Sequence, residues 1–248
     1  MIIRPHGETN ITTACQNSCA SCNHFIPMQD PSFIKPEILE MDLNALSGFL
    51  HFSRYNLVGG EPTLHPKIID LLQIVKDSGI TDTMEITSNG QSVRRLPESF
   101  WGMIDEFIVT PYKLTNEDIG YIDRKCKEHG TAIQWHPVIF TAAAYKRRSN
   151  KPEADYRYKT CWYNVNRHVI DNGYFYRCCT APFIPSVLMG LSKEHDGIAI
   201  EGLTEERLDE YLLQDETPES CFVCASNCGP VIDWHETDRE HWIDESLR

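Results

Sequence analysis

The sequence predicts an α/β protein in which a partial barrel of five or six β/α units is followed by a small domain of a β-hairpin and helices. Two patterns support this fold class. Between residue 9 and about residue 139, short apolar runs alternate with segments whose apolar residues recur at helical spacing, as expected for β/α units on a parallel sheet. Farther along, Asn172 and Gly173 stand between two β-prone runs, which is a strong hairpin signal.

The elements of the barrel can be assigned in order along the chain. A helix is expected after Pro36, because proline suits the first helical turn and the leucines that follow share one face. Two later helices are expected to end at Gly79 and Gly130, since glycine readily adopts the left-handed conformation of a helix C-cap. Strands are expected at residues 10–14, 55–58, 83–87, 106–110 and 131–138. These strands are too few for an eight-unit barrel, and ligands are expected at their carboxyl ends.

Composition limits the location and the partners. We place the barrel at residues 1–140, a polar linker at 141–160 and a second domain at 161–248. The formal charge of −13 argues against nucleic acid as a partner. No apolar run reaches the length of a membrane span and the first residues lack the apolar core of a signal peptide, so a cytoplasmic location is expected. Ten cysteines in that compartment indicate metal binding or catalysis rather than disulfides.

The expected linker is strongly basic. Two interpretations stay open, namely a solvated loop or a loop that receives an anionic group of the substrate, such as a phosphate, a nucleotide or a carboxylate. The bases are Lys146, Arg147, Arg148, Lys151, Arg157 and Lys159.

Three cysteines near the start of the chain, Cys15, Cys19 and Cys22, form a C-x3-C-x2-C run. A [4Fe-4S] cluster is usually held by four thiolates, so three of them leave one iron open to a substrate or cofactor. A Gly-Gly-Glu-Pro segment and a Ser-Asn-Gly segment then follow two successive expected strands. Their residues are Gly59, Gly60, Glu61, Pro62, Ser88, Asn89 and Gly90.

Together the three motifs resemble those of the radical S-adenosylmethionine (SAM) enzymes. The resemblance implies a [4Fe-4S] cluster on the three cysteines, a Gly-Gly-Glu-Pro segment that holds the methionine amino group of SAM, and a Ser-Asn-Gly segment that contacts its ribose and carboxylate. The family commonly has an aromatic residue before the third cysteine, whereas this chain has Ser21, with Phe25 the nearest ring for the adenine. A zinc site that includes His24 is the alternative.

A second cysteine set follows in the expected hairpin domain. Cys161 and Cys178 flank the hairpin, and Cys221 and Cys224 form a later close pair. This arrangement resembles the SPASM/twitch extension of radical SAM enzymes, which implies an auxiliary [4Fe-4S] cluster that moves electrons. Cys228 could replace Cys178 or Cys179 as a ligand, and a zinc ribbon on the same thiolates is the alternative.

The resemblance implies reductive cleavage of SAM to a 5'-deoxyadenosyl radical that takes a hydrogen atom from a small polar substrate. If the auxiliary cluster then takes an electron and a base takes a proton, the result is a two-electron oxidation, as in the small twitch dehydrogenases that act on aminocyclitols. If a thiol returns hydrogen, the result is epimerisation, for which Cys179 is the candidate donor. His136 and Tyr112 are candidates for the base or for substrate contact.

Other functions stay open. The chain could modify peptides, as many SPASM enzymes do in the maturation of ribosomally made peptides, although a cluster motif that starts at Cys15 leaves no room for an N-terminal peptide-recognition domain. A two-cluster electron carrier is the non-enzymatic alternative, and it leaves the Gly-Gly-Glu-Pro segment unexplained. The radical SAM interpretation requires an external electron donor of the flavodoxin or ferredoxin type. Residues 234–247 are expected either to form a terminal helix on the second domain or to face a partner.

Overall fold

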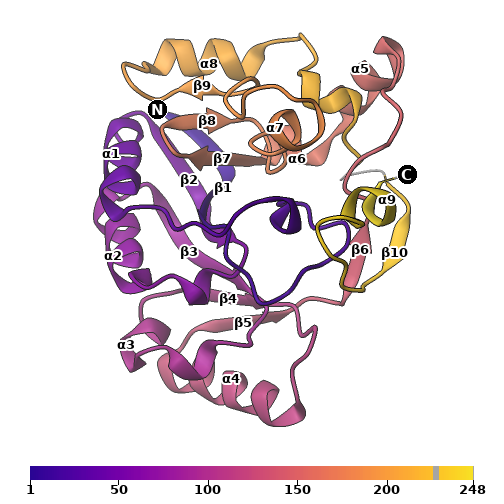
Figure 1. The fold of residues 1–248 in the computed structure, drawn as a ribbon. Coiled ribbons are helices and arrows are strands. Elements are labelled where there is room, and N and C mark those ends of the chain that lie inside the picture. Colours follow the sequence, from indigo (N-terminus) through magenta and orange to yellow (C-terminus); the bar gives the residue numbers. More distant parts are fainter. Residues whose placement is uncertain (226–228, 248) are drawn as a thin grey trace.

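The computed structural model describes residues 1–225 and 229–247, and its framework is one sheet of eight strands in the order β5-β4-β3-β2-β1-β7-β8-β9 (Figure 1). Pairing from β5 to β7 in this order is parallel, and β8 and β9 add antiparallel strands. The predicted α/β class with a partial parallel barrel is therefore confirmed. The strands of the sheet are β1 (Ile2–Thr12), β2 (Leu50–Gly59), β3 (Thr81–Ser88), β4 (Glu106–Val109), β5 (Ala132–Trp135), β7 (Arg167–Asp171), β8 (Tyr174–Tyr176) and β9 (Ile198–Ala199). A separate antiparallel pair consists of β6 (Ile139–Thr141) and β10 (Val231–Asp233).

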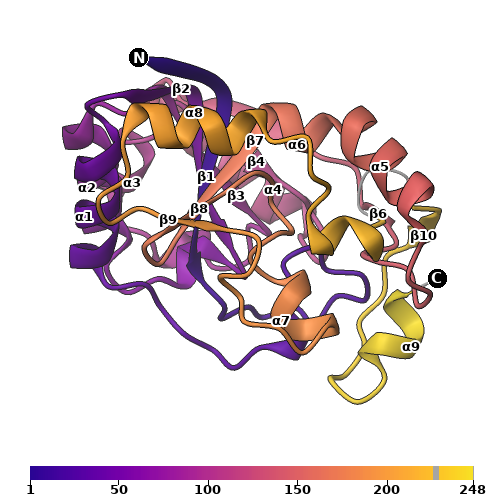
Figure 2. The same ribbon diagram turned by 90° about the horizontal axis from the view of Figure 1, so that it is seen from above.

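The helices cover the outer face of the sheet and its far end. In Figures 1 and 2, α1 and α2 lie side by side against β1 to β3, and α8 lies beside β8 and β9. The α-helices are α1 (Pro36–Leu46), α2 (Ile68–Ser78), α3 (Glu98–Trp101), α4 (Asn116–His129), α5 (Lys151–Thr160), α6 (Trp162–Asn166), α7 (Ile184–Leu188), α8 (Glu205–Leu213) and α9 (Trp242–Ser246). Short 3-10 helices are η1 (Ile26–Met28), η2 (Pro62–Leu64), η3 (Val93–Arg95) and η4 (Glu219–Phe222). No helix in the described part of the chain is both long and apolar enough to span a bilayer.

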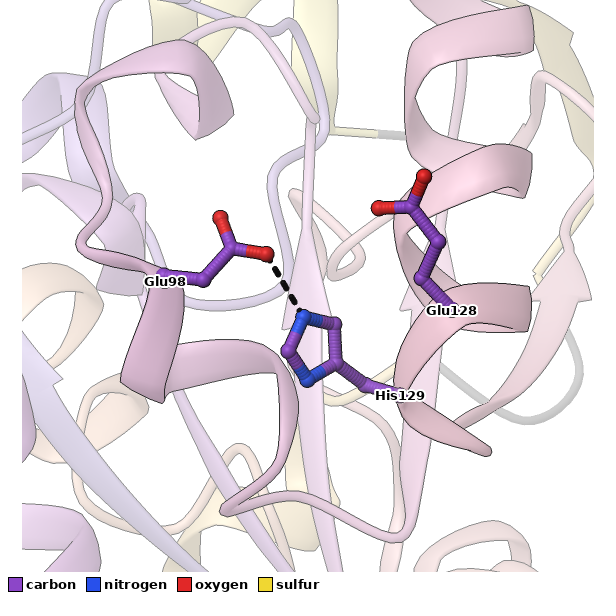
Figure 3. Close-up of side chains that lie close together, drawn as sticks. All are labelled: Glu98, Glu128 and His129. Carbon is purple, nitrogen blue, oxygen red and sulfur yellow. Dashed lines mark hydrogen bonds and ion pairs between the residues drawn. The ribbon is translucent and has the colours of Figure 1, made fainter.

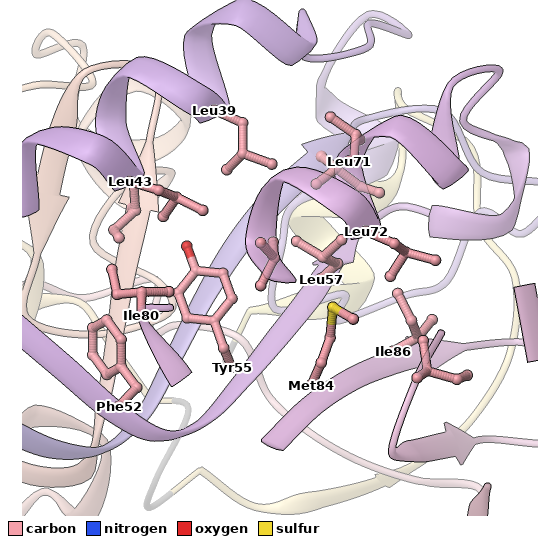
Figure 4. Packing of buried hydrophobic residues seen from close by; sticks show 14 of the residues in the cluster. Leu39, Leu43, Phe52, Tyr55, Leu57, Leu71, Leu72, Ile80, Met84 and Ile86 are labelled. Atoms are coloured by element: carbon pink, nitrogen blue, oxygen red, sulfur yellow. The ribbon is translucent and has the colours of Figure 1, made fainter. Parts of the chain in front are cut away.

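The two faces of the sheet differ in polarity. Because successive side chains of a strand point to opposite faces, alternate residues of β2 and β3 face the helices. These residues form the main core with α1 and α2, as Figure 4 shows for Leu39, Leu57, Leu71 and Met84. Tyr55 brings a hydroxyl into this core, and it lies 2.6 Å from the hydroxyl oxygen of the fully buried Thr9. Cys126 is buried in the same core, as its position on α4 predicts.

The inner face of the sheet is polar and charged. Arg54 on β2 makes ion pairs with the buried Glu85 on β3 and with Glu106 on β4. On the other side of β2, Arg167 on β7 lies 3.6 Å from the carboxylate of Glu8 on β1. Buried ion pairs contribute little net free energy of folding, so stability alone does not account for the charges on this face.

The position of β7 departs from the predicted organisation. Asn172 and Gly173 do form the expected hairpin turn, with φ values of 47° and 84°. However, β7 pairs in parallel with β1 and supplies the sixth strand of the barrel, and β8 and β9 extend the same sheet. Residue 161 therefore does not separate two sheets, because one hydrogen-bonded ladder includes strands from both sides of it.

The segment expected as a basic linker is largely folded and paired. Residues 151–160 form α5, which begins with a capping box between Asn150 and Glu153. Five of the six bases interact with other groups of the protein, which favours a structural role over the binding of an anion. The pairs are Lys146 with Asp244, Arg147 with Glu153, Arg148 with Glu219, Lys151 with Asp155, and Arg157 with the carbonyl of Cys221.

The buried hydroxyl pair predicts a measurable coupling between strands. Tyr55→Phe should lower the free energy of unfolding by about 1–2 kcal/mol, because it leaves the Thr9 hydroxyl buried without its partner. The double variant Thr9→Val with Tyr55→Phe should lose less than the sum of the two single changes. Urea titration of the four proteins checks this, and strictly additive losses would contradict the coupling.

Candidate cluster, cofactor and substrate site

The first cysteine set lies in the loop that leaves the carboxyl end of β1. Cys15, Cys19 and Cys22 line a cavity of about 120 Å³. The ends of β2 and β3 form the opposite wall, with Gly59, Gly60, Thr87, Ser88 and Asn89. The fold thus brings the three sequence motifs to one cavity at the carboxyl ends of adjacent parallel strands, where open α/β sheets bind ligands.

The two glycines allow the chain after β2 to approach the cysteine loop closely. The Gly60 amide donates to the carbonyl of Thr12 at 2.7 Å, and the Glu61 amide donates to that of Ala14 at 2.8 Å. A Cβ atom on Gly59 or Gly60 would lie 2.3 Å from one of these carbonyl oxygens, and Gly59 has a φ of 144°. Glycine is therefore required here by the neighbouring backbone, and the same two residues expose their main chain to the cavity.

Glu61 is fully buried and its carboxylate is occupied by the protein. It accepts from the Thr63 amide at 3.0 Å, the Thr63 hydroxyl at 2.5 Å, the Ser88 hydroxyl at 2.7 Å and the Asn89 amide at 2.7 Å. Burial raises the pKa of Glu61, and these hydrogen bonds oppose the rise. Neither Glu61 nor the buried Pro62 lines the cavity. The geometry makes Glu61 a positioning residue for Ser88 and Asn89, which do line it.

Burial acts on all three thiols of this loop. Burial raises the pKa of Cys15 and Cys22 to about 11 and that of Cys19 to about 12, so thiolates would be costly here without a compensating cation. Several N–H groups already point at sulfur, among them the Asn89 side-chain amide, 3.8 Å from the sulfur of Cys15. The Asn17 amide lies 3.4 Å from the sulfur of Cys15, and the indole nitrogen of Trp234 lies 3.1 Å from that of Cys19.

Residues 234–247 cover the cysteine loop. The Ala20 amide donates to the carbonyl of His235, the Thr237 amide donates to that of Ser18, and the indole of Trp242 donates to that of Cys19. Figure 1 shows this segment, with α9, beside the loop. The described part of the segment therefore belongs to the first cysteine site, and Trp234 is a site residue that the sequence motifs did not identify.

Phe25 does not have the position expected of an adenine contact. Its ring is fully buried in a second core, 5.1 Å from the ring of Trp242 and 6.4 Å from that of Phe183, and it lines neither cavity described here. The backbone at Phe25 is left-handed, with a φ of 54°, and this turn carries the ring into the core. Ser21, where the family commonly has an aromatic residue, is buried and bonded to Ser246 through both its amide and its hydroxyl.

A larger cavity of about 310 Å³ adjoins the first one and lies over the polar inner face of the sheet. The two cavities share the lining residues Asn23, His24, Val58, Thr87, Thr110, Tyr112 and Phe140. The candidates Tyr112, His136 and Cys179 all line the larger cavity, together with Glu8, Tyr163 and Arg167. Tyr112 also stacks on Trp234, with ring centroids 5.2 Å apart.

His24 lines both cavities, and its ring is neutral with the proton on Nδ1. Its Nδ1 lies 2.8 Å from the carbonyl oxygen of Gly59, so Nδ1 carries the proton and donates. Burial lowers the pKa of His24 to about 4, which keeps the ring neutral near pH 7 and leaves Nε2 as an acceptor.

The second cysteine set also converges. Cys161, Cys178, Cys221 and Cys224 line one small cavity, and Cys179 does not. The Thr180 hydroxyl oxygen lies 3.6 Å from the sulfur of Cys178 and 3.7 Å from that of Cys224. Tyr163 lines both this cavity and the larger one. Cys228, the alternative ligand, lies outside the described residues.

One surface cluster has the composition of a metal site but a different explanation. Figure 3 shows Glu98, Glu128 and His129 between α3 and α4, with His129 bonded to Glu98 at 2.7 Å. The ammonium of Lys125 binds Glu98 at 2.8 Å and Glu128 at 3.1 Å. Because a cation of the protein already bridges both carboxylates, this cluster is a surface ion-pair network.

Comparison with known proteins supports the same fold. BtrN, solved in complex with AdoMet and 2-DOIA, matches with a TM-score of 0.54 at 14% identity, over 86% of this chain and 83% of BtrN. An open conformation of BtrN matches with a TM-score of 0.48 at 15% identity, over 86% and 81%. A GTP 3',8-cyclase from Crocosphaera subtropica is 38% identical over 52 residues, which are 21% of this chain and only 15% of the cyclase. No protein-family model matches the chain.

The chain therefore has the fold of the radical SAM enzymes, as its cysteine and glycine motifs predict. Identity to the solved structure is low and the match to the cyclase is short, so these likenesses assign the fold and leave the reaction and the substrate to be argued from the site.

The role of Glu61 predicts a large stability effect at a residue outside the cavity. Glu61→Ala should lower the free energy of unfolding by about 2–4 kcal/mol, because it leaves four donors without their acceptor. Denaturant titration checks this. The exposed Glu40→Ala on α1 serves as the control and should change stability by less than about 0.5 kcal/mol. Equal losses for the two variants would contradict the positioning role.

Proposed function

We propose that this protein is a radical SAM enzyme that removes a hydrogen atom from a small polar substrate. The observation that carries the proposal is the convergence of three thiols, two glycines and the Ser88–Asn89 segment on one cavity that shares a wall with a larger polar one. A cofactor cavity next to a substrate cavity is what hydrogen-atom abstraction requires, because the reacting atoms must lie in contact.

In this proposal Cys15, Cys19 and Cys22 hold a [4Fe-4S] cluster. SAM binds at the main chain of Gly59 and Gly60 and at Ser88 and Asn89, so the main chain, rather than the occupied Glu61 carboxylate, would meet its amino group. When bound, cluster and SAM supply a carbon-centred radical strong enough to take hydrogen from an unactivated C–H bond.

The protein's own residues position the cluster and SAM, stabilise the charge on the cysteine sulfurs and exclude water from the cysteine loop. The Asn17 amide and the Trp234 indole donate to cysteine sulfurs and so favour their thiolate charge. Residues 234–247 shield the loop from solvent. Neutral His24 offers an acceptor at the wall that the two cavities share, where a cationic ring would repel the sulfonium of SAM.

We favour two-electron oxidation as the outcome, with an auxiliary [4Fe-4S] cluster on Cys161, Cys178, Cys221 and Cys224 as the electron acceptor. Four thiols that line one cavity support that ligand set, and Tyr163, which lines this cavity and the larger one, supports a short route for an electron. An external donor of the flavodoxin or ferredoxin type would reduce the first cluster.

Epimerisation is the second candidate, and Cys179 favours it. Its thiol lines the substrate cavity rather than the auxiliary one. Burial raises the pKa of Cys179 well above the ordinary value, so the sulfur keeps the hydrogen that a donor to a substrate radical needs. Peptide modification and simple electron transfer have less support, because a cavity of about 310 Å³ suits a small molecule and an electron carrier needs no such cavity.

The two cysteine sets predict two clusters. Anaerobically reconstituted protein should lose about half of its iron when Cys15, Cys19 and Cys22 are all replaced by Ala, and the rest when Cys161, Cys178, Cys221 and Cys224 are also replaced. Iron and zinc analysis checks this, with the buried core thiol variant Cys126→Ala as the control that keeps all its iron. Stoichiometric zinc, or iron that is unchanged in the triple variant, would contradict the proposal.

Product analysis separates the two outcomes. Oxidation gives a product that is lighter by two hydrogens, and Cys179→Ala should still form it. Epimerisation in D2O gives a product of the substrate's composition with one deuterium from solvent, and Cys179→Ala should then consume SAM without forming the epimer. Mass spectrometry after turnover in D2O decides, and a deuterium-labelled epimer from the wild-type enzyme would reverse our preference for oxidation.

A further inference from the structure

One polar pair in the larger cavity, Glu8 and Arg167, is only partly satisfied by the fold. Glu8, in the middle of β1, is 1% exposed, and its Oε1 has no hydrogen-bond partner among the described residues. Its other oxygen lies 3.6 Å from Nη1 of Arg167, a distance that allows an ion pair but is long for a hydrogen bond. Nε of Arg167 is also buried without a partner. Both residues line the cavity.

Unsatisfied groups of this kind are costly, so their position is informative. A buried carboxylate oxygen without a donor costs at least about 1–3 kcal/mol of stability. The nearby Arg54 is already held by Glu85 and Glu106, so Arg167 is the cation left for Glu8. Oε1 of Glu8 is an acceptor without a donor, and Nε of Arg167 is a donor without an acceptor. Both residues line the same cavity, so a ligand with one donor and one acceptor could satisfy both atoms.

We propose that Glu8 and Arg167 form the substrate subsite and that they select an uncharged hydroxyl compound. The hydroxyl on the carbon that loses hydrogen donates to Oε1 of Glu8, and a neighbouring oxygen of the same molecule accepts from Nε of Arg167. With Glu8 ionised, the pair is neutral as a whole, which suits an uncharged substrate and disfavours the anionic one that the basic segment suggests. This inference rests on the proposed radical SAM function.

Glu8 is also placed to act as a base. The hydroxyl O–H bond breaks, its proton moves to Oε1 of Glu8, and both bonding electrons stay on the substrate oxygen. The added negative charge makes a substrate radical easier to oxidise by one electron, which is the outcome favoured above. Burial raises the pKa of Glu8 to about 7, so the carboxyl can hold that proton near neutral pH.

The test measures binding of two probes to the anaerobically reconstituted protein with SAM. The probes are myo-inositol, an uncharged polyol, and its 1-phosphate, and the proteins are wild type, Glu8→Gln, Arg167→Gln and the exposed control Glu40→Gln. We expect wild type and control to bind the polyol and to bind the phosphate more weakly. Glu8→Gln should weaken polyol binding about tenfold or more, because it removes a charged acceptor. It should also strengthen phosphate binding, because it leaves Arg167 unopposed, and Arg167→Gln should weaken the binding of both probes.

A pH series separates substrate contact from a purely structural effect. Polyol affinity of the wild type should fall as the pH drops through about 7, where Glu8 takes up a proton, and that of Glu8→Gln should stay level. The comparison removes the contribution of the other titratable and charged groups around Glu8. These are Arg167, Glu85, Arg54, His6, His24, His136, Tyr163 and Cys179.

The outcomes are distinct from those that test the radical SAM function. Tighter binding of the phosphate by wild type, no polyol binding, or equal polyol binding by wild type and Glu8→Gln would overturn this inference while iron content and SAM binding stay intact. Protein without iron or SAM binding would overturn the proposed function itself. Thermal unfolding of each variant confirms that lost binding is not lost folding.

Discussion

Two backbone hydrogen bonds, from the Gly60 amide to Thr12 at the end of β1 and from the Glu61 amide to Ala14 just beyond it, fix the geometry on which the rest of the site depends. They continue the parallel pairing of β1 and β2 beyond the strands themselves. The cysteine loop and the glycine segment therefore begin side by side. Glu61 links the end of β3 to this arrangement, because its carboxylate accepts hydrogen bonds from Ser88 and Asn89. The ends of three strands are thus joined by two main-chain hydrogen bonds and by the carboxylate of Glu61.

The same sheet separates two kinds of interior. On its outer face, residues such as Tyr55 and Leu57 pack against α1 and α2 in an apolar core. On its inner face, several of the alternate residues are charged and pair across strands. A fold that needed only stability would fill this inner face with apolar side chains, since buried ion pairs contribute little net free energy. Packing alone therefore does not account for the polarity of the inner face.

The sequence was most informative where local pattern and chemistry coincide. Periodicity predicted the β/α units and the spacing of cysteines predicted both thiol groups, because each depends on residues close in sequence. Glu8 was missed because it lies upstream of the strand predicted at residues 10–14. The roles of Phe25 and Trp234 could not be predicted, since they depend on contacts with segments about two hundred residues away. The sixth strand was assigned to a separate domain because a hairpin signal does not reveal which sheet its first strand joins.

The contact between Trp234 and Cys19 joins positions 215 residues apart in the chain. During synthesis the cysteine loop is therefore made long before the segment that covers it. Closure by residues 234–247 comes afterwards, so the three thiols of the loop are made first and are covered last.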